Sequence, residues 1–127
     1  MSEQAATPVP AVRRKRPVVS ACIVNWNCRE QLRACLRSLA RKRHGLRLEV
    51  LVVDNASTDG AAEMVQREFP RVVLIRNGGN AGYARACNQA AERARGRWLL
   101  FLNNDTVLPP GSLRALVRSA RAVPGLG

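Results

Sequence analysis

The feature that most limits the fold of this chain is a repeated alternation between short β-branched runs and longer amphipathic segments. Apolar runs that fit buried strands occupy residues 18–24, 49–53, 72–75 and 97–102. Helical spacing of apolar residues follows each run, over residues 28–43, 59–70, 83–95 and from 109 onward. Strands and helices that alternate through short connections form βαβ units. The sequence therefore predicts an α/β fold with a mostly parallel sheet of about four strands.

Each expected helix has a face that the spacing predicts to be buried. These faces comprise Leu32, Cys35, Leu36 and Leu39; Met64 and Val65; Ala84, Cys87, Ala91 and Ala94; and Leu113, Leu116, Val117 and Ala120. The helix boundaries are signalled by capping and breaking residues, namely Asp59 as an N-cap, Pro109-Pro110 at a start, and Gly45, Pro70 and Gly96 at ends.

The chain is expected to form one folded unit preceded by a tail. Its 127 residues are 46% hydrophobic, which suits one compact domain over residues 18–127. Residues 1–17 are small, polar and basic and are expected to be a flexible tail without the apolar stretch of a signal peptide. No apolar run approaches the roughly 20 residues of a membrane span. The four cysteines match no zinc spacing and indicate reduced thiols, so a cytoplasmic location is expected.

The net charge of +12 favours polyanionic partners. Arg29, Arg33, Arg37 and Arg41 recur every fourth residue and would form one cationic stripe on a helix. Two interpretations are open, a solvent-facing stripe or peripheral contact with an anionic membrane at its inner face. A basic nucleic-acid-binding module is a further alternative, but only 4% of the residues are aromatic, so stacking platforms are missing.

A polar cluster follows each expected strand. The clusters are Asn25-Trp26-Asn27, Asp54 to Asp59, Asn77 to Gly82, and Asn103-Asn104-Asp105-Thr106. Such residues are also ordinary in turns and helix caps, so each cluster alone has that simpler explanation. Parallel strands nevertheless place all four clusters along one sheet edge, where open α/β sheets bind ligands. Together the clusters predict a shared site.

The residue types at this edge limit its chemistry. The first strand-to-helix turn has no glycines and the chain has no P-loop motif, which argues against NAD and against ATP on a Walker loop. The single histidine, His44, is read as an exposed capping residue. Carboxylates and carboxamides suit Mg²⁺ or Mn²⁺ shared with a diphosphate. Asp54 could accept a hydrogen bond from a pyrimidine imide, and Trp26 is either an aromatic wall beside the base or a core residue.

The ordered motifs resemble a known family. The stretches 24–27, 52–59, 80–88 and 102–106 together are similar to the nucleotide-binding half of a family 2 glycosyltransferase, in its rhamnosyltransferase-like branch. The resemblance covers roughly residues 18–122 and implies a Rossmann-like GT-A fold. It also implies cell-wall or polysaccharide biosynthesis, in which a sugar passes with inversion from a nucleotide diphosphate-sugar to a glycan or lipid-linked acceptor.

The resemblance also implies roles for particular residues. Asp54 would hold the nucleobase, Trp26 would lie beside it, and Asp105 would be the metal ligand of a D-x-D-like motif whose first acid is replaced by Asn103. The family often has a basic residue at the position of Cys87, and Arg85 is the nearby candidate for the phosphates. The full donor-binding set is Asn25, Trp26, Asn27, Asp54, Asn55, Asn80, Gly82, Arg85, Asn88, Asn103 and Asn104.

The catalytic base that the family uses on the acceptor is expected beyond Gly127, so this chain alone is expected to bind donor with weak or absent transfer activity. A sugar-phosphate nucleotidyltransferase is a third alternative. It would need a glycine-rich, basic loop after the first strand, which the sequence lacks.

Overall fold

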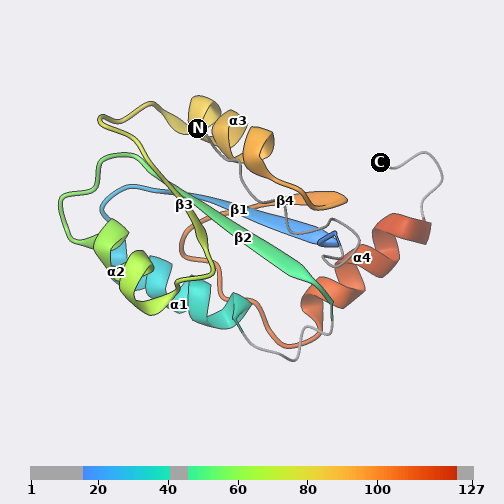
Figure 1. Cartoon of the computed structure of the whole chain (residues 1–127). Coiled ribbons are helices and arrows are strands. Elements are labelled where there is room, and N and C mark those ends of the chain that lie inside the picture. Colours follow the sequence, from blue (N-terminus) through green and yellow to red (C-terminus); the bar gives the residue numbers. More distant parts are fainter. Residues whose placement is uncertain (1–15, 41–45, 123–127) are drawn as a thin grey trace, which may run out of the picture.

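The computed structural model describes residues 16–40 and 46–122. Strands and helices alternate through the whole of this part of the chain (Figure 1). Their bounds are β1 Val19–Asn25, α1 Arg29–Leu39, β2 Leu48–Asp54, α2 Ala61–Glu68, β3 Val73–Arg76, α3 Tyr83–Arg93, β4 Trp98–Leu102 and α4 Ser112–Ala122. The predicted α/β class and four-stranded sheet are confirmed.

The four strands form one parallel sheet in the order β3-β2-β1-β4. The chain runs outward from β1 to β3 and then crosses back to place β4 on the other side of β1. Helix α3 makes this return on one face of the sheet, whereas α1 and α2 lie on the other face (Figure 1). This reversal creates a topological switch point between β1 and β4.

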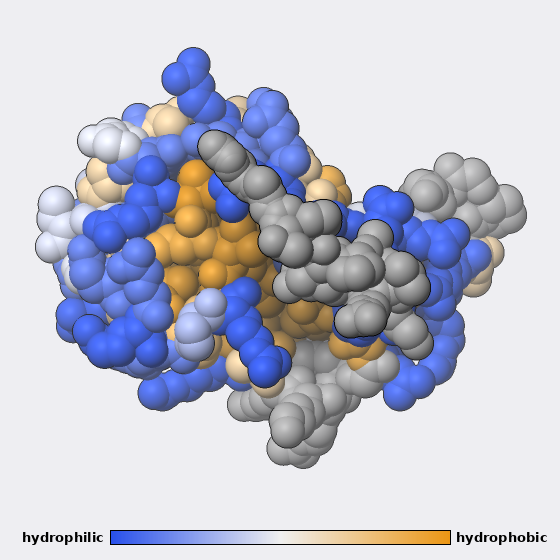
Figure 2. All heavy atoms as spheres, viewed as in Figure 1, coloured by the Kyte–Doolittle hydropathy of each residue, from blue (hydrophilic) through white to orange (hydrophobic). Residues whose placement is uncertain are grey.

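The sheet separates two apolar clusters. The larger cluster joins the β-strand residues Ala21, Ile23 and Val52 to the inner faces of α1, α2 and α4. The smaller cluster packs Cys22, Leu51 and Val53 against α3. Figure 2 shows apolar surface in the middle of the face in view, between hydrophilic surroundings. Strand β1 and the second half of β2 are thus covered on both faces, as their continuous β-branched runs predict. In β4, however, Leu99 and Phe101 remain 45% and 43% exposed.

The predicted inner faces of α1 and α2 are confirmed, but those of α3 and α4 need correction. In α3 the buried residues are Ala86 and Ala90, whereas Ala84 is exposed. In α4 Leu113 and Val117 are buried, whereas Leu116 is 50% exposed. An alanine-rich helix has several nearly equivalent small-residue stripes, so the packing of α3 on β1 and β2 decides which stripe turns inward.

Several predicted boundaries also shift. Gly60, with φ 84°, is the N-cap of α2 in place of Asp59, and α4 begins at Ser112 rather than at the two prolines. Helix α3 ends at Arg93, three residues before Gly96. The predicted end of the first helix at Gly45, the histidine His44 and most of the N-terminal tail lie outside the described residues.

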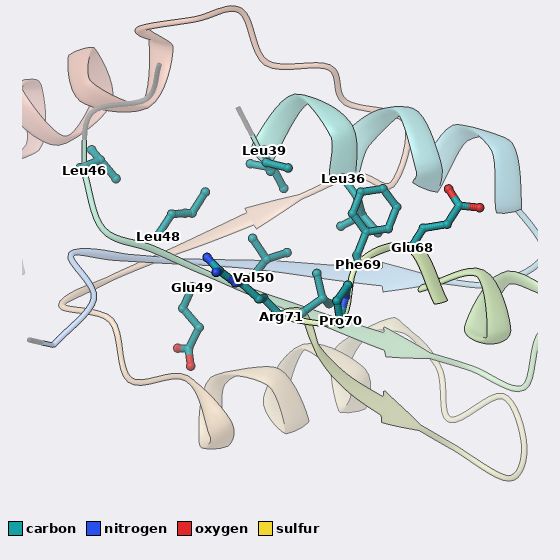
Figure 3. Close-up of a pocket in the computed structure, with 12 residues that line it drawn as sticks. Leu36, Leu39, Leu46, Leu48, Glu49, Val50, Glu68, Phe69, Pro70 and Arg71 are labelled. Carbon is teal, nitrogen blue, oxygen red and sulfur yellow. The ribbon is translucent and has the colours of Figure 1, made fainter. Parts of the chain in front are cut away.

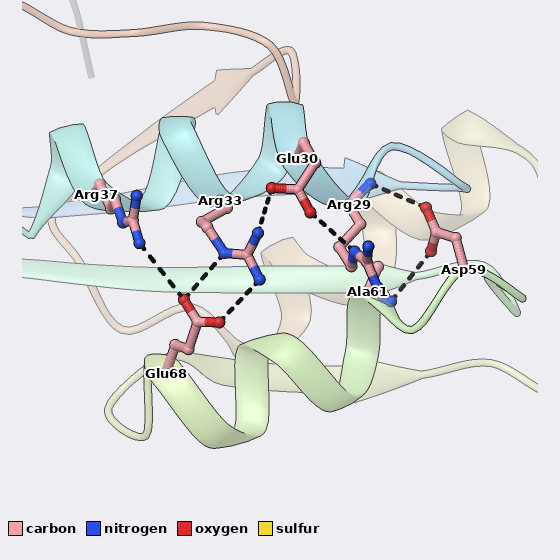
Figure 4. Close-up of polar contacts among 7 residues, drawn as sticks. All are labelled: Arg29, Glu30, Arg33, Arg37, Asp59, Ala61 and Glu68. Carbon is pink, nitrogen blue, oxygen red and sulfur yellow. Dashed lines mark hydrogen bonds and ion pairs between the residues drawn. The ribbon is translucent and has the colours of Figure 1, made fainter.

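The described arginines of the α1 stripe form ion pairs within the fold (Figure 4). Arg33 forms ion pairs with Glu30 on its own helix and with Glu68 on α2, the latter at 2.9 Å. Arg29 pairs with Glu30 at 2.9 Å, and Arg37 approaches Glu68 at 3.9 Å. The hydrogen bond from Arg33 lowers the pKa of Glu68 below its usual value. Through Arg33 and Arg37 the described part of this stripe joins α1 to α2, although its three arginines share only two glutamates. Arg41 lies outside the described residues.

The cysteines among the described residues are unpaired, as the sequence predicts for reduced thiols. Cys22 and Cys35 are buried in the two apolar clusters. Burial raises the pKa of each of these thiols to about 11, with a smaller contribution from Glu49 for Cys22 and from Asp105 for Cys35. Both thiols therefore remain protonated at neutral pH and behave as small apolar core residues.

Gly96 is required by a close backbone approach between the α3–β4 connection and β1. A Cβ atom at Gly96 would lie 2.5 Å from both the backbone nitrogen and the hydroxyl of Ser20 and 2.8 Å from the carbonyl carbon of Val19. We expect Gly96→Ala to lower the free energy of unfolding by about 2 kcal/mol, because β1 must shift to relieve the overlap. Urea denaturation measures this loss. Gly79→Ala is the control, since a Cβ there meets nothing within 4 Å, and equal losses in both variants would contradict the prediction.

Candidate functional site

The polar clusters after β1, β2 and β4 meet at the carboxyl edge of the sheet. Asn25 and Asp54 are register partners at the ends of β1 and β2. The amide of Asn25 donates a hydrogen bond to Asp54 Oδ1 at 3.1 Å. The amide of Asn104, from the loop after β4, donates to Asn25 Oδ1 at 3.0 Å. This chain of side chains crosses the switch point between β4 and β1, where open α/β sheets place their ligands.

Asp54 is the central acceptor of this network and is only 2% exposed. In addition to the amide of Asn25, its carboxylate accepts hydrogen bonds from the hydroxyl of Ser57 at 2.7 Å and from the backbone N–H of Ser57 at 2.9 Å. Ser57 is not among the site residues predicted from the sequence. Its spacing of three residues from an aspartate in a turn is the signal that could have identified it.

The loops after β1 and β2 each contain a residue whose backbone has a positive φ, which residues other than glycine rarely adopt. Asn27 has φ 50°, and its side-chain oxygen accepts a hydrogen bond from the backbone N–H of Thr58 at 2.7 Å. The backbone N–H of Asn27 donates to the hydroxyl of Ser57 at 2.9 Å. Ala56, in the loop after β2 and next to Ser57, has φ 63°. Such left-handed residues persist only where their surroundings hold them, and they concentrate at functional sites.

A second hydrogen-bond network joins β2 to the loop before α3. Asn55 is 2% exposed, and its side-chain oxygen accepts from the amide of Asn77 at 2.8 Å. The Asn55 amide donates to the carbonyl of Gly82 at 3.4 Å. Asn77 also exchanges two 2.8 Å hydrogen bonds with Gln89 of α3. Gln89 is not among the residues predicted from the sequence, because a polar residue on a helix carries no signal of its partner.

Asp59 holds the N-termini of α1 and α2 beside this edge (Figure 4). One carboxylate oxygen accepts from the backbone N–H of Arg29 at 2.9 Å, and the other accepts from that of Ala61 at 3.0 Å. A carboxylate at two helix N-termini satisfies free N–H groups and complements both helix dipoles. The arrangement fixes the direction in which both helices leave the edge.

The remaining predicted residues lie on the exposed parts of the same loops and of α3. Trp26 is 53% exposed, so the core interpretation of this tryptophan is wrong. Asn80, whose side chain accepts from the backbone N–H of Gly82 at 2.9 Å, is exposed too. The other exposed members are Arg85, Asn88, Asn103 and Asp105. No hydrogen bond within the described residues joins Trp26 or Asp105 to Asp54, so their grouping around one ligand stays a prediction.

The oxygen ligands available around Asp105 suit a cation that is also bound by a substrate diphosphate better than a cation bound by the protein alone. No three His, Cys, Asp or Glu side chains of the described residues gather into a metal-binding group. Asp105 supplies one carboxylate, with the carboxamides of Asn103 and Asn104 as its sequence neighbours. Mg²⁺ and similar cations are commonly bound through one or two carboxylates plus substrate phosphates, with water completing the shell. The residues fit a cation that arrives with a diphosphate.

A separate hollow of about 430 Å³ lies away from this edge. It is formed where α1 and α2 end and β2 begins, and Leu36, Leu48 and Phe69 are among its lining residues (Figure 3). Its lining combines aliphatic side chains with the charged residues Glu49, Glu68 and Arg71. It lacks the carboxamide and carboxylate groups of the carboxyl edge, so we do not assign the candidate site to it.

A doubly wound parallel sheet with buried polar networks at its switch point defines a Rossmann-like α/β fold. The chain belongs to the Glycosyl transferase family 2, whose family model matches residues 20–124. Within the described residues, no helix is both long and apolar enough to cross a membrane.

Two curated relatives and one solved structure illustrate the similarity. The putative teichuronic acid biosynthesis glycosyltransferase TuaG of Bacillus subtilis is 34% identical over 71% of this chain and 36% of its own length. An N-acetylglucosaminyl-diphospho-decaprenol L-rhamnosyltransferase of Mycobacterium tuberculosis is 34% identical over 71% of this chain and 32% of its own. The mannosyltransferase PcManGT from Pyrobaculum calidifontis, solved with GDP-Man and Mn²⁺, is 28% identical with a TM-score of 0.68, covering 87% of this chain and 34% of that one. The chain thus spans about a third of the length of these relatives.

Proposed function

We propose that residues 18–127 form the donor-binding subdomain of a glycosyltransferase that binds a nucleotide diphosphate-sugar together with a divalent cation. The observation that carries the proposal is the hydrogen-bonded series Asn104–Asn25–Asp54 across the switch point. It brings three of the sequence-predicted clusters to one edge. Membership of the glycosyl transferase family supports the reaction class, and the GDP-Man and Mn²⁺ named for PcManGT support the ligand class.

The proposed roles follow the exposure of each group. Trp26, exposed beside the buried Asn25, offers an aromatic face to the nucleobase. Asp54 is proposed to recognise the base edge, either directly or by holding the loop that carries Ser57. Arg85, exposed in the first turns of α3, is proposed to contact the phosphates.

Asp105, supported by Asn103 and Asn104, is proposed to bind Mg²⁺ or Mn²⁺ when the donor is present. When bound there, the cation would supply Lewis-acid stabilisation of the charge that develops on the departing diphosphate. Binding with Asn103 in place of an acid leaves one formal negative charge at the motif. The cation is therefore proposed to bind weakly until the diphosphate adds its own charges.

The proposed transfer inverts the anomeric centre, because the acceptor hydroxyl attacks from the side opposite to the diphosphate. The acceptor is proposed to be a glycan or a lipid-linked sugar at the cytoplasmic face of a membrane. The carboxylates of Asp59, Glu63 and Glu68 are already bound to backbone N–H groups or arginines. Glu92 lies near the end of α3, which is remote from the carboxyl edge of the sheet. The base that receives the acceptor proton is accordingly proposed to lie beyond Gly127.

Titration calorimetry of the chain with UDP-, dTDP- and GDP-sugars, with and without Mn²⁺, tests the proposal. We expect binding of at least one donor that tightens by about tenfold or more with Mn²⁺, since the cation screens the diphosphate. Absence of heat with every donor would overturn the proposal. Binding of random duplex DNA with a steep salt dependence, in the absence of donor binding, would instead favour the basic nucleic-acid-binding module.

A further inference from the structure

The loop between β4 and α4 carries Asp105 and contains no helix or strand. It spans residues 103–111. The backbone N–H of Thr106 donates to the carbonyl of Asn103 at 3.1 Å, which closes a turn that contains Asp105. Within the described residues the Asp105 carboxylate forms no hydrogen bond or ion pair of its own. Its position therefore depends on the contacts that hold the loop on either side of it.

Two hydrogen bonds that involve side chains tie this loop to other elements of the described structure. Toward the sheet, the amide of Asn104 donates to Asn25 Oδ1 at 3.0 Å. Toward α1, the backbone N–H of Leu108 donates to Ser38 Oγ at 3.1 Å. Figure 1 shows the connection from β4 to α4 passing α1 on its way. Asp105 thus lies between two fixed points of the loop.

The contact to α1 is buried, and the direction of its hydrogen bonds is set by the helix. Ser38 is 1% exposed and Leu108 is 9% exposed. The Ser38 hydroxyl donates to the carbonyl of Cys35 at 2.7 Å, so its oxygen is left as an acceptor for the N–H of Leu108. Without this acceptor, the buried N–H of Leu108 is unsatisfied unless the loop moves toward water.

Asp105 also lies close enough to the same part of α1 for its charge to act there. Burial raises the pKa of the Cys35 thiol to about 11, and the Asp105 charge adds to this rise. Cys35 precedes Ser38 by three residues, so the two side chains lie on one side of α1. The loop therefore returns along the buried face of α1, with Asp105 near Cys35 and Leu108 bound to Ser38.

We propose that Ser38 is a positioning residue for the cation site, an inference that rests on the proposed binding of a donor and a divalent cation at Asp105. By holding Leu108, Ser38 fixes the far end of the loop and keeps Asp105 in the arrangement that binds the cation. A loop that is already ordered loses less conformational entropy when its ligand binds. A freed loop would populate the binding arrangement only part of the time, which weakens the apparent affinity by that fraction.

The variant Ser38→Ala tests the proposal, with Ser20→Ala as its matched control. Ser20 is also a buried serine, and its hydroxyl accepts from the backbone N–H of Gly96 at 2.7 Å. It lies near the start of β1, however, at the end of the sheet opposite to Asp105. Both substitutions remove a buried acceptor from a loop N–H and are expected to lower stability. Only Ser38→Ala removes it from the loop that carries Asp105.

Calorimetry with UDP-, dTDP- and GDP-sugars, with and without Mn²⁺, provides the first measurement. In Ser38→Ala the donor affinity in Mn²⁺ is expected to fall by about tenfold, with little change in the absence of the metal. In Ser20→Ala both affinities are expected to stay within about twofold of the wild type. Ser38→Cys keeps the size of the side chain but offers a weaker acceptor, so its affinity in Mn²⁺ is expected to be intermediate.

Amide hydrogen exchange of the free chain provides a second measurement that needs neither donor nor cation. In Ser38→Ala the backbone N–H groups of Thr106 and Leu108 are expected to exchange about tenfold faster than in the wild type. The exchange of Ile23, in the middle of β1, is expected to change much less. Faster exchange at Thr106, which Ser38 does not contact, would show that the whole loop depends on this hydroxyl.

An unchanged Mn²⁺ effect in Ser38→Ala, beside a normal effect in the wild type, would overturn the proposal. Equal losses of the Mn²⁺ effect in Ser38→Ala and Ser20→Ala would overturn it as well, because they would show a response to stability alone. Unchanged exchange at Thr106 would show that the loop is held without Ser38, with the same consequence. Absence of any Mn²⁺ effect in the wild type would instead overturn the proposed cation site itself, and the exchange rates would still decide whether Ser38 holds the loop.

Discussion

Replacing Asp54 by alanine is expected to lower the free energy of unfolding by about 3 kcal/mol. The carboxylate is 2% exposed and accepts three hydrogen bonds, from the amide of Asn25 and from the hydroxyl and backbone N–H of Ser57. Its removal leaves these donors without their acceptor at a position where Asn25 is buried and Ser57 is partly buried. The penalty of unsatisfied buried donors, rather than the lost attraction alone, sets the size of the effect.

Urea denaturation of Asp54→Ala, Ser57→Ala and Asp105→Ala separates this effect from a general loss of acidic residues. Ser57→Ala removes the hydroxyl but keeps the backbone contact to Asp54, so about 1 kcal/mol is expected. Asp105 is exposed, and its replacement is expected to leave the unfolding midpoint unchanged. A loss below about 1 kcal/mol in Asp54→Ala would show that the network at this edge does not contribute to folding as its geometry indicates.

The positions of the strands could be predicted because their signal is local. Each run of β-branched and aliphatic residues is long enough to be buried on both faces, and the polar residue that ends it marks the carboxyl edge. The prediction that Asn25, Asp54 and Asn104 share one site required only that the strands be parallel, because the ends of parallel strands then lie at one edge of the sheet. The strand order, which puts β4 beside β1, decided that Asn104 reaches Asn25 rather than another residue.

Features that depend on partners far along the chain could not be predicted. The sequence predicts the cationic stripe of α1 but not its ion pairs with α2, because Glu68, which pairs with Arg33, is 35 residues away in sequence. The buried face of α3 could not be chosen from the sequence, because several alanines are spaced equally well. The contact between Asn77 and Gln89 could not be predicted either, because neither segment contains a pattern that indicates it. Conversely, the arginines of α4, spaced by four and three residues, also lie along one side of a helix. Only the structure shows that they lack acidic partners within its described residues and line a cavity.

Replacing Asp105 by alanine is expected to remove the effect of Mn²⁺ on donor affinity while the fold stays intact. Asp105 is the one carboxylate of the motif after β4, and its neighbours Asn103 and Asn104 are neutral. Loss of the carboxylate leaves only carboxamide oxygens, which bind a divalent cation more weakly than a charged ligand does. Calorimetry in the presence and absence of Mn²⁺ should show tenfold or more weakening with the metal and little change without it. Equal donor affinity in the variant and the wild type at saturating Mn²⁺ would remove Asp105 from the proposed site.

The substitution Asn103→Asp is expected to have the opposite effect and to strengthen the binding of Mn²⁺. It adds a second negative charge two residues before Asp105, at an exposed position where no buried contact is lost. Coulomb attraction then holds the cation without help from the diphosphate, so Mn²⁺ affinity in the absence of donor is expected to rise by about tenfold. Asn80→Asp is the control, because it adds the same charge to an exposed loop before α3. A comparable rise in Mn²⁺ affinity with Asn80→Asp would show that overall charge, and not the motif after β4, governs binding of the cation. A rise confined to Asn103→Asp that disappears again in the double variant with Asp105→Ala would place the cation between these two positions.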